Sequence, residues 1–258
     1  MKQQEKDKRR KKWWAILFWI LLWQALSVLF RKVYINGHIL LASPIESIIR
    51  LAELAVTLSF WRTILFSTVN IFGGFLIGCL LGVILAFLSY KSNFIYELLS
   101  PVTAAIKSVP VVSFIILALI WVDGKDLSLL ISALIVFPPV YLNTLAGIKA
   151  TDDKLLEMAR IFRMSLWQKM RGILLPQLLP YFASAVSAAL GMCWKAGVSA
   201  EVIGVSSGTI GERLYTSKVY FETADLFAWS VVIVILSSVI EKTVLFLLGK
   251  LAERSGLK

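Results

Sequence analysis

The chain has 258 residues, of which 58% are hydrophobic and 17% charged, a composition typical of integral membrane proteins that excludes an ordinary soluble domain. Its net charge of +11 would favour nucleic-acid binding in a soluble protein, but here the basic residues are concentrated in two places. Seven lie in residues 1–12, ahead of the first apolar segment, and six lie in residues 149–176, between two later ones. This distribution is expected of cytoplasmic segments, so we expect a membrane protein that binds no nucleic acid.

Six apolar segments are long enough to cross a lipid bilayer. In chain order they cover residues 13–30, 60–90, 94–122, 127–148, 177–195 and 226–248. The first has eighteen residues without a charge, which corresponds to about 27 Å of helix. Its basic leader resembles a secretory signal, with residues 25–27 as a tolerable cleavage site. The width of the apolar run and the Trp and Phe residues inside it favour an uncleaved span.

The connections between these segments are short or polar. Residues 31–59 are expected to be external, with an amphipathic helix after Ser43-Pro44. Residues 123–126 form a tight external turn, and residues 198–225 a polar external connection. We expect the third span to be broken or kinked near Pro110, because an internal proline disrupts helical hydrogen bonding.

The predicted fold class is therefore an all-α integral membrane protein with six transmembrane helices. Six spans place both termini in the cytoplasm. Seventeen of the 27 basic residues then lie inside and seven outside, as the positive-inside rule requires. We expect a basic cytoplasmic leader over residues 1–12 and a single transmembrane domain over residues 13–258.

The segment 152–180 is the one long amphipathic, charged stretch in the second half of the chain. Its first apolar residues recur at helical spacing, at Leu155, Met158, Ala159 and Phe162. Ser165 followed by Gln168 predicts a capping box that opens a second short helix. We therefore predict a helix–turn–helix over 152–172, joined at Arg163 and Met164. A basic, structured loop between spans is expected on the cytoplasmic side, where it offers a docking surface to a soluble partner.

The same segment resembles the cytoplasmic signature of the permease subunits of bacterial ABC importers: E-A-A, three residues, G, nine residues, then I-x-L-P. Glu157-Met158-Ala159, Arg163 and residues 173–176 (Ile-Leu-Leu-Pro) stand at these spacings. Met158 replaces the first Ala and Arg163 replaces the Gly. A Gly adopts positive φ at little cost, whereas Arg in the left-handed region costs about 1–2 kcal/mol. The turn either keeps that conformation at this cost or uses different backbone angles.

The resemblance covers roughly residues 40–250 and implies a type I ABC importer permease fold. Residues 200–204 (Ala-Glu-Val-Ile-Gly) and the order of spans look like the nitrate/sulfonate/taurine branch. It further implies a homodimer that pairs with two copies of an ATPase subunit, takes solute from an external solute-binding protein, and lies in the bacterial inner membrane. The residues that would couple to the ATPase are Glu157, Met158, Ala159, Arg160, Arg163, Trp167 and Pro176.

A stripe of small residues runs along one face of the second span. Asn70, Gly74, Gly78 and Gly82 repeat every four residues. Small residues allow helix backbones to approach closely in a membrane, and a polar neighbour can add a hydrogen bond. Packing within one subunit is the main expectation, with a dimer seam and a pore lining as alternatives.

Two lysines within spans are candidates for a translocation path. Lys107 precedes Pro110 in the third span, and Lys195 shares a face of the fifth span with small residues. A charged side chain at this depth should face protein or water, and a proline-interrupted helix beside such a lysine is typical of transport pathways. Either Lys195 extends to the outer interface or pairs with Glu201, or these three residues belong to the path of an anionic solute.

Other residues point away from chemistry in this chain. His38 is the only histidine and has no metal-ligand partners near it. Cys79 and Cys193 both fall within spans and are interpreted as small apolar residues. No G-x-x-x-x-G-K-S/T loop is present, so we expect no cofactor here and ATP binding by a partner chain. The alternatives are a channel or scaffold without ATP coupling, and an intramembrane enzyme, which would need a Ser–His, metal or carboxylate constellation within a span.

Overall fold

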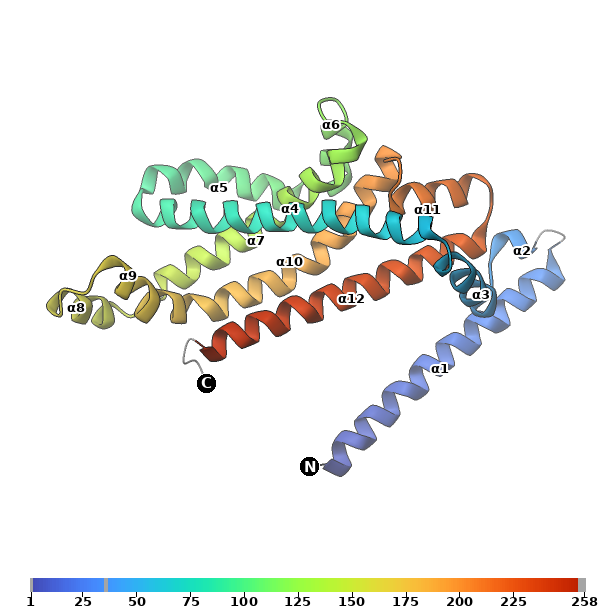
Figure 1. Ribbon diagram of the computed structural model, residues 1–258, viewed down its shortest axis with the longest axis horizontal. Helices are drawn as coiled ribbons and strands as arrows, with labels where there is room; N and C mark the ends of the chain where they lie inside the picture. Colours follow the sequence, from blue (N-terminus) through green and yellow to red (C-terminus); the bar gives the residue numbers. More distant parts are fainter. Residues whose placement is uncertain (1, 35–36, 255–258) are drawn as a thin grey trace. The chain divides into compact units, whose positions relative to one another are not determined.

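The computed structural model describes residues 2–34 and 37–254, and in this part of the chain the regular elements are all helices, without strands (Figure 1). In chain order the helices are α1 (Lys2–Val33), α2 (Gly37–Leu40), α3 (Pro44–Ala55), α4 (Leu58–Lys91), α5 (Asn93–Ser108), α6 (Val111–Ala118), α7 (Gly124–Lys149), α8 (Asp153–Ile161), α9 (Leu166–Lys169), a π-helical segment (Met170–Leu174), α10 (Leu175–Gly204), α11 (Ile210–Val219) and α12 (Thr223–Arg254).

Five stretches of helix in the described residues are long and apolar enough to cross a membrane. They are Trp14–Val33, Leu58–Lys91, Gly124–Lys149, Trp167–Gly204 and Thr223–Lys250. The pair α5 and α6 passes the same test together but is bent by 104°. The prediction of six spans agrees with this count when the bent pair is taken as one span.

The break between α5 and α6 lies where it was predicted. Val109 is extended, at φ −83° and ψ 135°, and Pro110 follows with φ −56° and ψ 135°. Proline disfavours the α conformation in the residue before it and has no N–H to continue the helix. The prediction of a broken third span is confirmed.

The fifth span differs from its predicted bounds, because α10 continues to Gly204. Residues 198–204 were expected to begin a polar external connection. They are instead helical, because their only charged side chain, that of Glu201, is fully buried and hydrogen-bonded. The helix ends at Val205, which adopts the left-handed conformation with φ 45°.

The chain divides into two compact units, and the long helix α4 runs from one to the other. One unit consists of residues 1–63 and 213–233, and the other of residues 64–212 and 234–258. The expectation of one domain over residues 13–258 stays a prediction.

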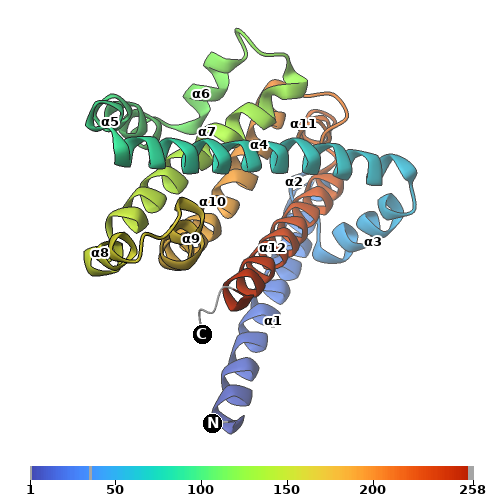
Figure 2. The same cartoon turned by 60° about the vertical axis from the view of Figure 1, so that its left-hand side comes forward.

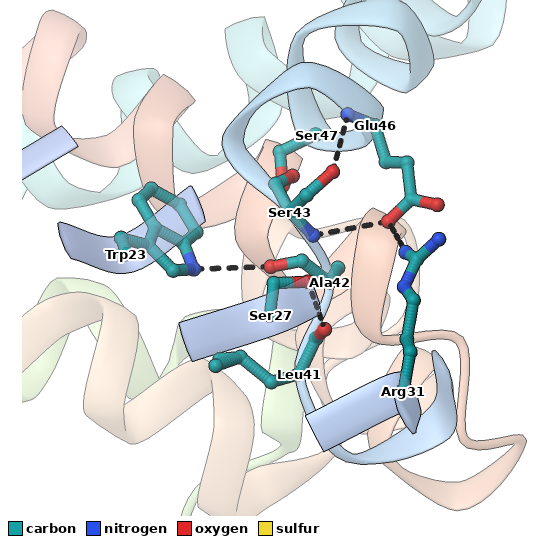
Figure 3. Close-up of polar contacts among 8 residues, drawn as sticks. All are labelled: Trp23, Ser27, Arg31, Leu41, Ala42, Ser43, Glu46 and Ser47. Atoms are coloured by element: carbon teal, nitrogen blue, oxygen red, sulfur yellow. Dashed lines mark hydrogen bonds and ion pairs between the residues drawn. The ribbon is translucent and has the colours of Figure 1, made fainter. Parts of the chain in front are cut away.

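The first unit contains the predicted amphipathic helix, α3. Ser43 caps it through a reciprocal capping box: its Oγ accepts from Glu46 N at 3.2 Å, and its own N–H donates to Glu46 Oε2 at 3.0 Å (Figure 3). The chain leading into the cap is fixed to α1, because Trp23 Nε1 donates to Ala42 O at 3.0 Å and Ser27 Oγ to Leu41 O at 2.9 Å. The expected helix after Ser43-Pro44 is thereby confirmed.

The second unit is built on close packing of α7 with α10 and α4. A Cβ atom at Gly78 would lie 2.8 Å from Val136 Cβ, and one at Gly82 would lie 2.9 Å from Val140 Cγ1. One at Gly74 would overlap the carbonyl oxygen of Leu129. The predicted stripe of small residues therefore faces α7 of the same chain.

Asn70, the polar member of the same stripe, also reaches α7, where its Nδ2 donates to Lys125 O at 3.0 Å. Together with the glycines, it accounts for the stripe by contacts inside one subunit.

Candidate functional site

A cavity of about 600 Å³ opens in the second unit, among the α5–α6 break, α7 and α10. Its lining residues are Ile106, Lys107, Val109, Val111, Val112, Ile115, Ile135, Pro138, Pro139, Leu142, Asn143, Met192, Lys195, Ala196 and Ser199. The structure thus brings together Lys107 and Lys195, which the sequence places 88 positions apart. Both side chains are exposed rather than packed into the core.

The cavity is lined mainly by apolar side chains, with few polar groups. Apart from the two lysines, the polar side chains are those of Asn143 and Ser199, and no acidic residue is among the lining residues. Ser199 Oγ donates to Lys195 O at 2.8 Å, and Asn143 Nδ2 donates to Pro139 O at 2.8 Å. Two ammonium groups without a carboxylate beside them make the cavity electropositive, which favours an anionic occupant.

The start of α6 adds to this electrostatic character. Val111 and Val112, the first two residues of α6, line the cavity. The first N–H groups of a helix have no partner within it, so this end carries partial positive charge. Discontinuous helices with their N-terminal ends at a binding site are a recurrent feature of transport proteins.

Glu201 lies elsewhere in this unit, among α4, α10 and α11, and does not line the cavity. Its residue surface is 0% exposed. Its Oε2 accepts from Ser67 Oγ at 2.9 Å and from Gly211 N at 3.2 Å. Ser67 Oγ in turn accepts from Ile210 N at 2.9 Å.

The alternative in which Lys195 pairs with Glu201 is not what the structure shows. The ion pairs found among the described residues join Arg31 to Glu46 and Arg50 to Glu53 and Asp225. The two side chains lie in different surroundings, because Lys195 is on an exposed face of α10 and Glu201 is on a buried one.

A second candidate region is the predicted helix–turn–helix, formed by α8, α9 and the turn between them. Figures 1 and 2 both place α8 and α9 at the end of α7 and α10 that is opposite to α6. The Asp152 side chain caps α8 by accepting from Lys154 N at 2.9 Å. The start of the loop is also tied to α10, because Asp152 N donates to Gln177 Oε1 at 3.3 Å.

The turn after α8 keeps the conformation that a glycine would favour. Arg163 has φ 47°, in the left-handed region. Met164 N donates to Ala159 O at 2.9 Å and Arg163 N to Arg160 O at 3.1 Å, the two bonds of a Schellman motif. The sequence left two alternatives, a left-handed Arg163 or a turn with different backbone angles. The structure shows the first, in which Arg163 is left-handed despite its energetic cost.

The second helix of the loop begins as predicted. Gln168 N donates to Ser165 Oγ at 3.3 Å, and Ser165 N donates to Gln168 Oε1 at 2.8 Å, so the capping box is confirmed. The π-helical segment follows α9 directly and leads into α10. Pro176 accounts for the wider turn, because its ring would clash with the carbonyl of Gly172 in a regular α-helix. Leu175 N donates instead to Met170 O, five residues back.

The predicted coupling residues are mostly on the surface of this loop. Glu157, Arg160, Arg163 and Trp167 are exposed, Met158 is exposed to 40%, Pro176 is half-buried and Ala159 is buried. Ile161 and Phe162 are also exposed, at 78% and 74%, and were not among the predicted contacts. Phe162 had been assigned to the apolar face of the helix with Ala159. The structure separates the two, because the helix has ended at Ile161.

Other residues of the cavity were missed by sequence reasoning. Asn143, Ser199 and Met192 carry no pattern that distinguishes them in an apolar span. The adjacent prolines Pro138 and Pro139, inside a predicted span, are the one signal that could have indicated a site in α7. The side chain of His38, for which a structural or solvent-facing position was expected, lies outside the described side chains.

The sequence is similar to those of known membrane transport proteins. Residues 78–255 match the family described as "Binding-protein-dependent transport system inner membrane component". The chain is 28% identical to SsuC of Bacillus subtilis, named an aliphatic sulfonates transport permease protein, over 93% of this chain and 83% of that one. It is 26% identical to the nitrate import permease protein NrtB of Synechococcus elongatus, over 56% of this chain and 52% of that one.

Solved structures resemble this chain in fold. An amino acid ABC transporter crystallised with histidines matches with a TM-score of 0.58 and 21% identity, over 81% of this chain and 97% of that one. A bacterial ABC transporter involved in the import of the acidic polysaccharide alginate matches with a TM-score of 0.58 and 15% identity, over 98% and 99%. The predicted fold class is confirmed by these likenesses.

Proposed function

This chain belongs to the family of binding-protein-dependent transport system inner membrane components, and on that premise we propose that it carries a small anionic solute through the cavity that contains Lys107 and Lys195. It is a permease subunit of an ABC importer and a multi-pass protein of the bacterial inner membrane. The alternative of an intramembrane enzyme is set aside, because the family consists of transport subunits whose ATPase is a separate chain.

The observation that carries the proposal is the pairing of two lysines from different helices in one cavity without an acidic residue. A lysine within a span is costly unless water or a counter-ion reaches it. Two of them in one water-accessible cavity are stabilised by an anion that passes between them. The relatives named for sulfonates, nitrate and bicarbonate handle solutes of this charge, which supports the same class here.

The loop formed by α8 and α9 would couple ATP hydrolysis by the partner subunit to movement of this chain. Its exposed apolar side chains, Met158, Ile161, Phe162 and Trp167, are typical of a surface that docks into a groove of a partner. Glu157 and Arg160 would add charged contacts at the rim. The family implies an ATPase subunit and an external solute-binding protein, and we propose that this loop receives the ATPase and that the chain itself binds no cofactor.

The mechanism that follows is alternating access. ATP binding brings two ATPase subunits together, and the loops docked on them move with them. Because the loop continues through the π-helical segment into α10, its movement reaches the helix that carries Lys195. The cavity then opens outward to receive solute from the binding protein, and hydrolysis returns it inward. A symmetric pair of ATPase subunits calls for two loops, so we propose a homodimer of this chain.

The solute proposal is tested by uptake into proteoliposomes that contain the permease, its ATPase and its binding protein. The probes are ethanesulfonate, nitrate and bicarbonate. Lys107→Gln and Lys195→Gln together should reduce uptake of the transported probe at least tenfold and leave basal ATP hydrolysis intact. Lys125→Gln is the control, because Lys125 is exposed and does not line the cavity. Unchanged uptake in the double variant would refute the role of these lysines.

The coupling proposal is tested separately with Glu157→Ala. We expect either loss of assembly with the ATPase or an assembled complex that hydrolyses ATP without transport. Glu53→Ala, at an exposed acidic residue of α3, controls for the loss of one surface charge. Equal uptake and hydrolysis in the wild type and the Glu157 variant would reduce the loop to a solvated connection.

A further inference from the structure

The helix α3 presents one apolar face outward, away from the rest of the first unit. Ile45, Ile48 and Ile49 are exposed to 58%, 64% and 54%, whereas Ser47 is buried. At 100° per residue these isoleucines share one face of the helix, together with Ala52. This is the reverse of the arrangement on the surface of a soluble protein.

The polar face of α3 is held by specific bonds inside the first unit. Glu46 pairs with Arg31 of α1, and Ser47 Oγ donates to Ser43 O at 2.9 Å (Figure 3). Arg50 pairs with Asp225 through two contacts, and its Nη2 donates to Asp225 Oδ2 at 3.3 Å. Turning the helix to bury its isoleucines would break the ion pairs of Glu46 with Arg31 and of Arg50 with Asp225, so these two pairs hold the apolar face outward.

The same helix lies in the connection between two membrane spans. α1 precedes it, with a span at Trp14–Val33 of which almost no residue is buried, and α4 follows it with a span that begins at Leu58. The helix α3 therefore lies in the stretch where the chain leaves the bilayer after one span and re-enters it at the next.

Aromatic side chains lie at both ends of this connection. Tyr34, after α1, is exposed to 52%, and Trp61, at the start of α4, is exposed to 57%. Trp61 Nε1 donates to Ala55 O at 2.9 Å, which ties the end of α3 to the first turn of α4. Trp and Tyr are enriched at the membrane–water interface, where one part of the ring is apolar and another is polar.

We propose that α3 is an interfacial helix that lies on the outer surface of the bilayer, with Ile45, Ile48 and Ile49 inserted among the lipids. An amphipathic helix with one broad apolar face binds a membrane surface in this way. Its ion pairs then fix the height of α1 relative to the lipid surface. The partner is the bilayer itself, and neither the solute-binding protein nor a second copy of the chain is needed to cover this face.

The experiment uses spin labels on the assembled importer in bilayers of phosphatidylethanolamine and phosphatidylglycerol. Single cysteines replace Ile45, Ile48 and, as a matched control on the polar edge of the same helix, Glu53. Cys79 and Cys193 are first changed to alanine in the background. Collision rates with oxygen, which concentrates in lipid, are compared with those of a water-soluble nickel chelate.

Labels at Ile45 and Ile48 should collide more with oxygen than with the chelate, and the label at Glu53 should show the opposite ratio. High access of the chelate at Ile48 would mean that the face lies in water and would overturn the proposal. Low access of both probes would mean that protein covers the face, which would also overturn it. All three positions are exposed, and although the label at Glu53 removes one partner of Arg50, the pair with Asp225 remains. The labels should therefore not disturb folding, and retained ATP hydrolysis verifies this.

Discussion

The adjacent glycines Gly73 and Gly74 of α4 offer a direct measure of how tightly α4 packs on α7. A methyl group at Gly74 would overlap Leu129 O and lie 2.7 Å from Ser132 Cβ, whereas one at Gly73 would lie 3.7 Å from Leu129 Cδ1, an ordinary contact. Both substitutions to alanine gain up to about 1 kcal/mol in helix propensity. Only Gly74→Ala also incurs overpacking, which costs about 1–3 kcal/mol, and more where the obstacle is backbone.

Gly73→Ala should therefore leave the free energy of unfolding unchanged or raise it slightly, and Gly74→Ala should lower it. The assay is the thermal unfolding midpoint of the purified complex, which moves by about 2–4 °C per kcal/mol in a chain of this size. We expect the two midpoints to differ by about 4 °C or more, with Gly74→Ala lower. Equal midpoints would refute the close approach of the two helices.

Three further predictions concern single residues. Arg163→Gly should relieve the left-handed backbone cost and stabilise the loop by about 1 kcal/mol, measured by slower amide exchange in α8, whereas Arg163→Ala, which keeps the cost, should not. Glu201→Ala leaves two buried donors unpaired and should lower the unfolding midpoint more than Glu201→Gln, which retains an acceptor. The hydrogen bond from Arg31 lowers the pKa of Glu46. Its stabilisation is therefore complete above the ordinary carboxyl pKa and is lost as pH falls through the lowered value. Glu46→Gln should remove this part of the acid dependence of the midpoint.

Local signals in the sequence predicted most of the helical framework. The helix after Ser43-Pro44, the capping box at Ser165 and the break at Pro110 were each predicted from residues close together in the sequence, and the structure confirms all three. The membrane spans could also be predicted, because the thickness of the bilayer sets a minimum length for an apolar segment that crosses it. Periodicity also indicated that the glycines of α4 share one face.

The features that were not predicted depend on contacts between residues far apart in the sequence. No sequence feature near Glu201 indicates that Ser67, 134 positions earlier, donates a hydrogen bond to its carboxylate. This bond allows α10 to continue past the predicted end of the span. The cavity is likewise a product of three helices, and its residues Asn143 and Ser199 become recognisable only when Lys107 is placed opposite them. The conformation of Arg163 was undecided because the cost of a left-handed arginine, about 1–2 kcal/mol, is small enough for the rest of the turn to offset.

The helix that leads from the loop formed by α8 and α9 into the membrane differs in stiffness along its length. From Trp167 to Gly204 it is continuous, yet the π-helical turn and the missing N–H groups of Pro176 and Pro180 weaken its hydrogen bonding near the loop. If the ATPase docks on this loop as proposed, the weakly hydrogen-bonded segment would let the helix bend near the loop. The stiffer portion that carries Lys195 could then move with the ATPase and keep its own tilt in the membrane.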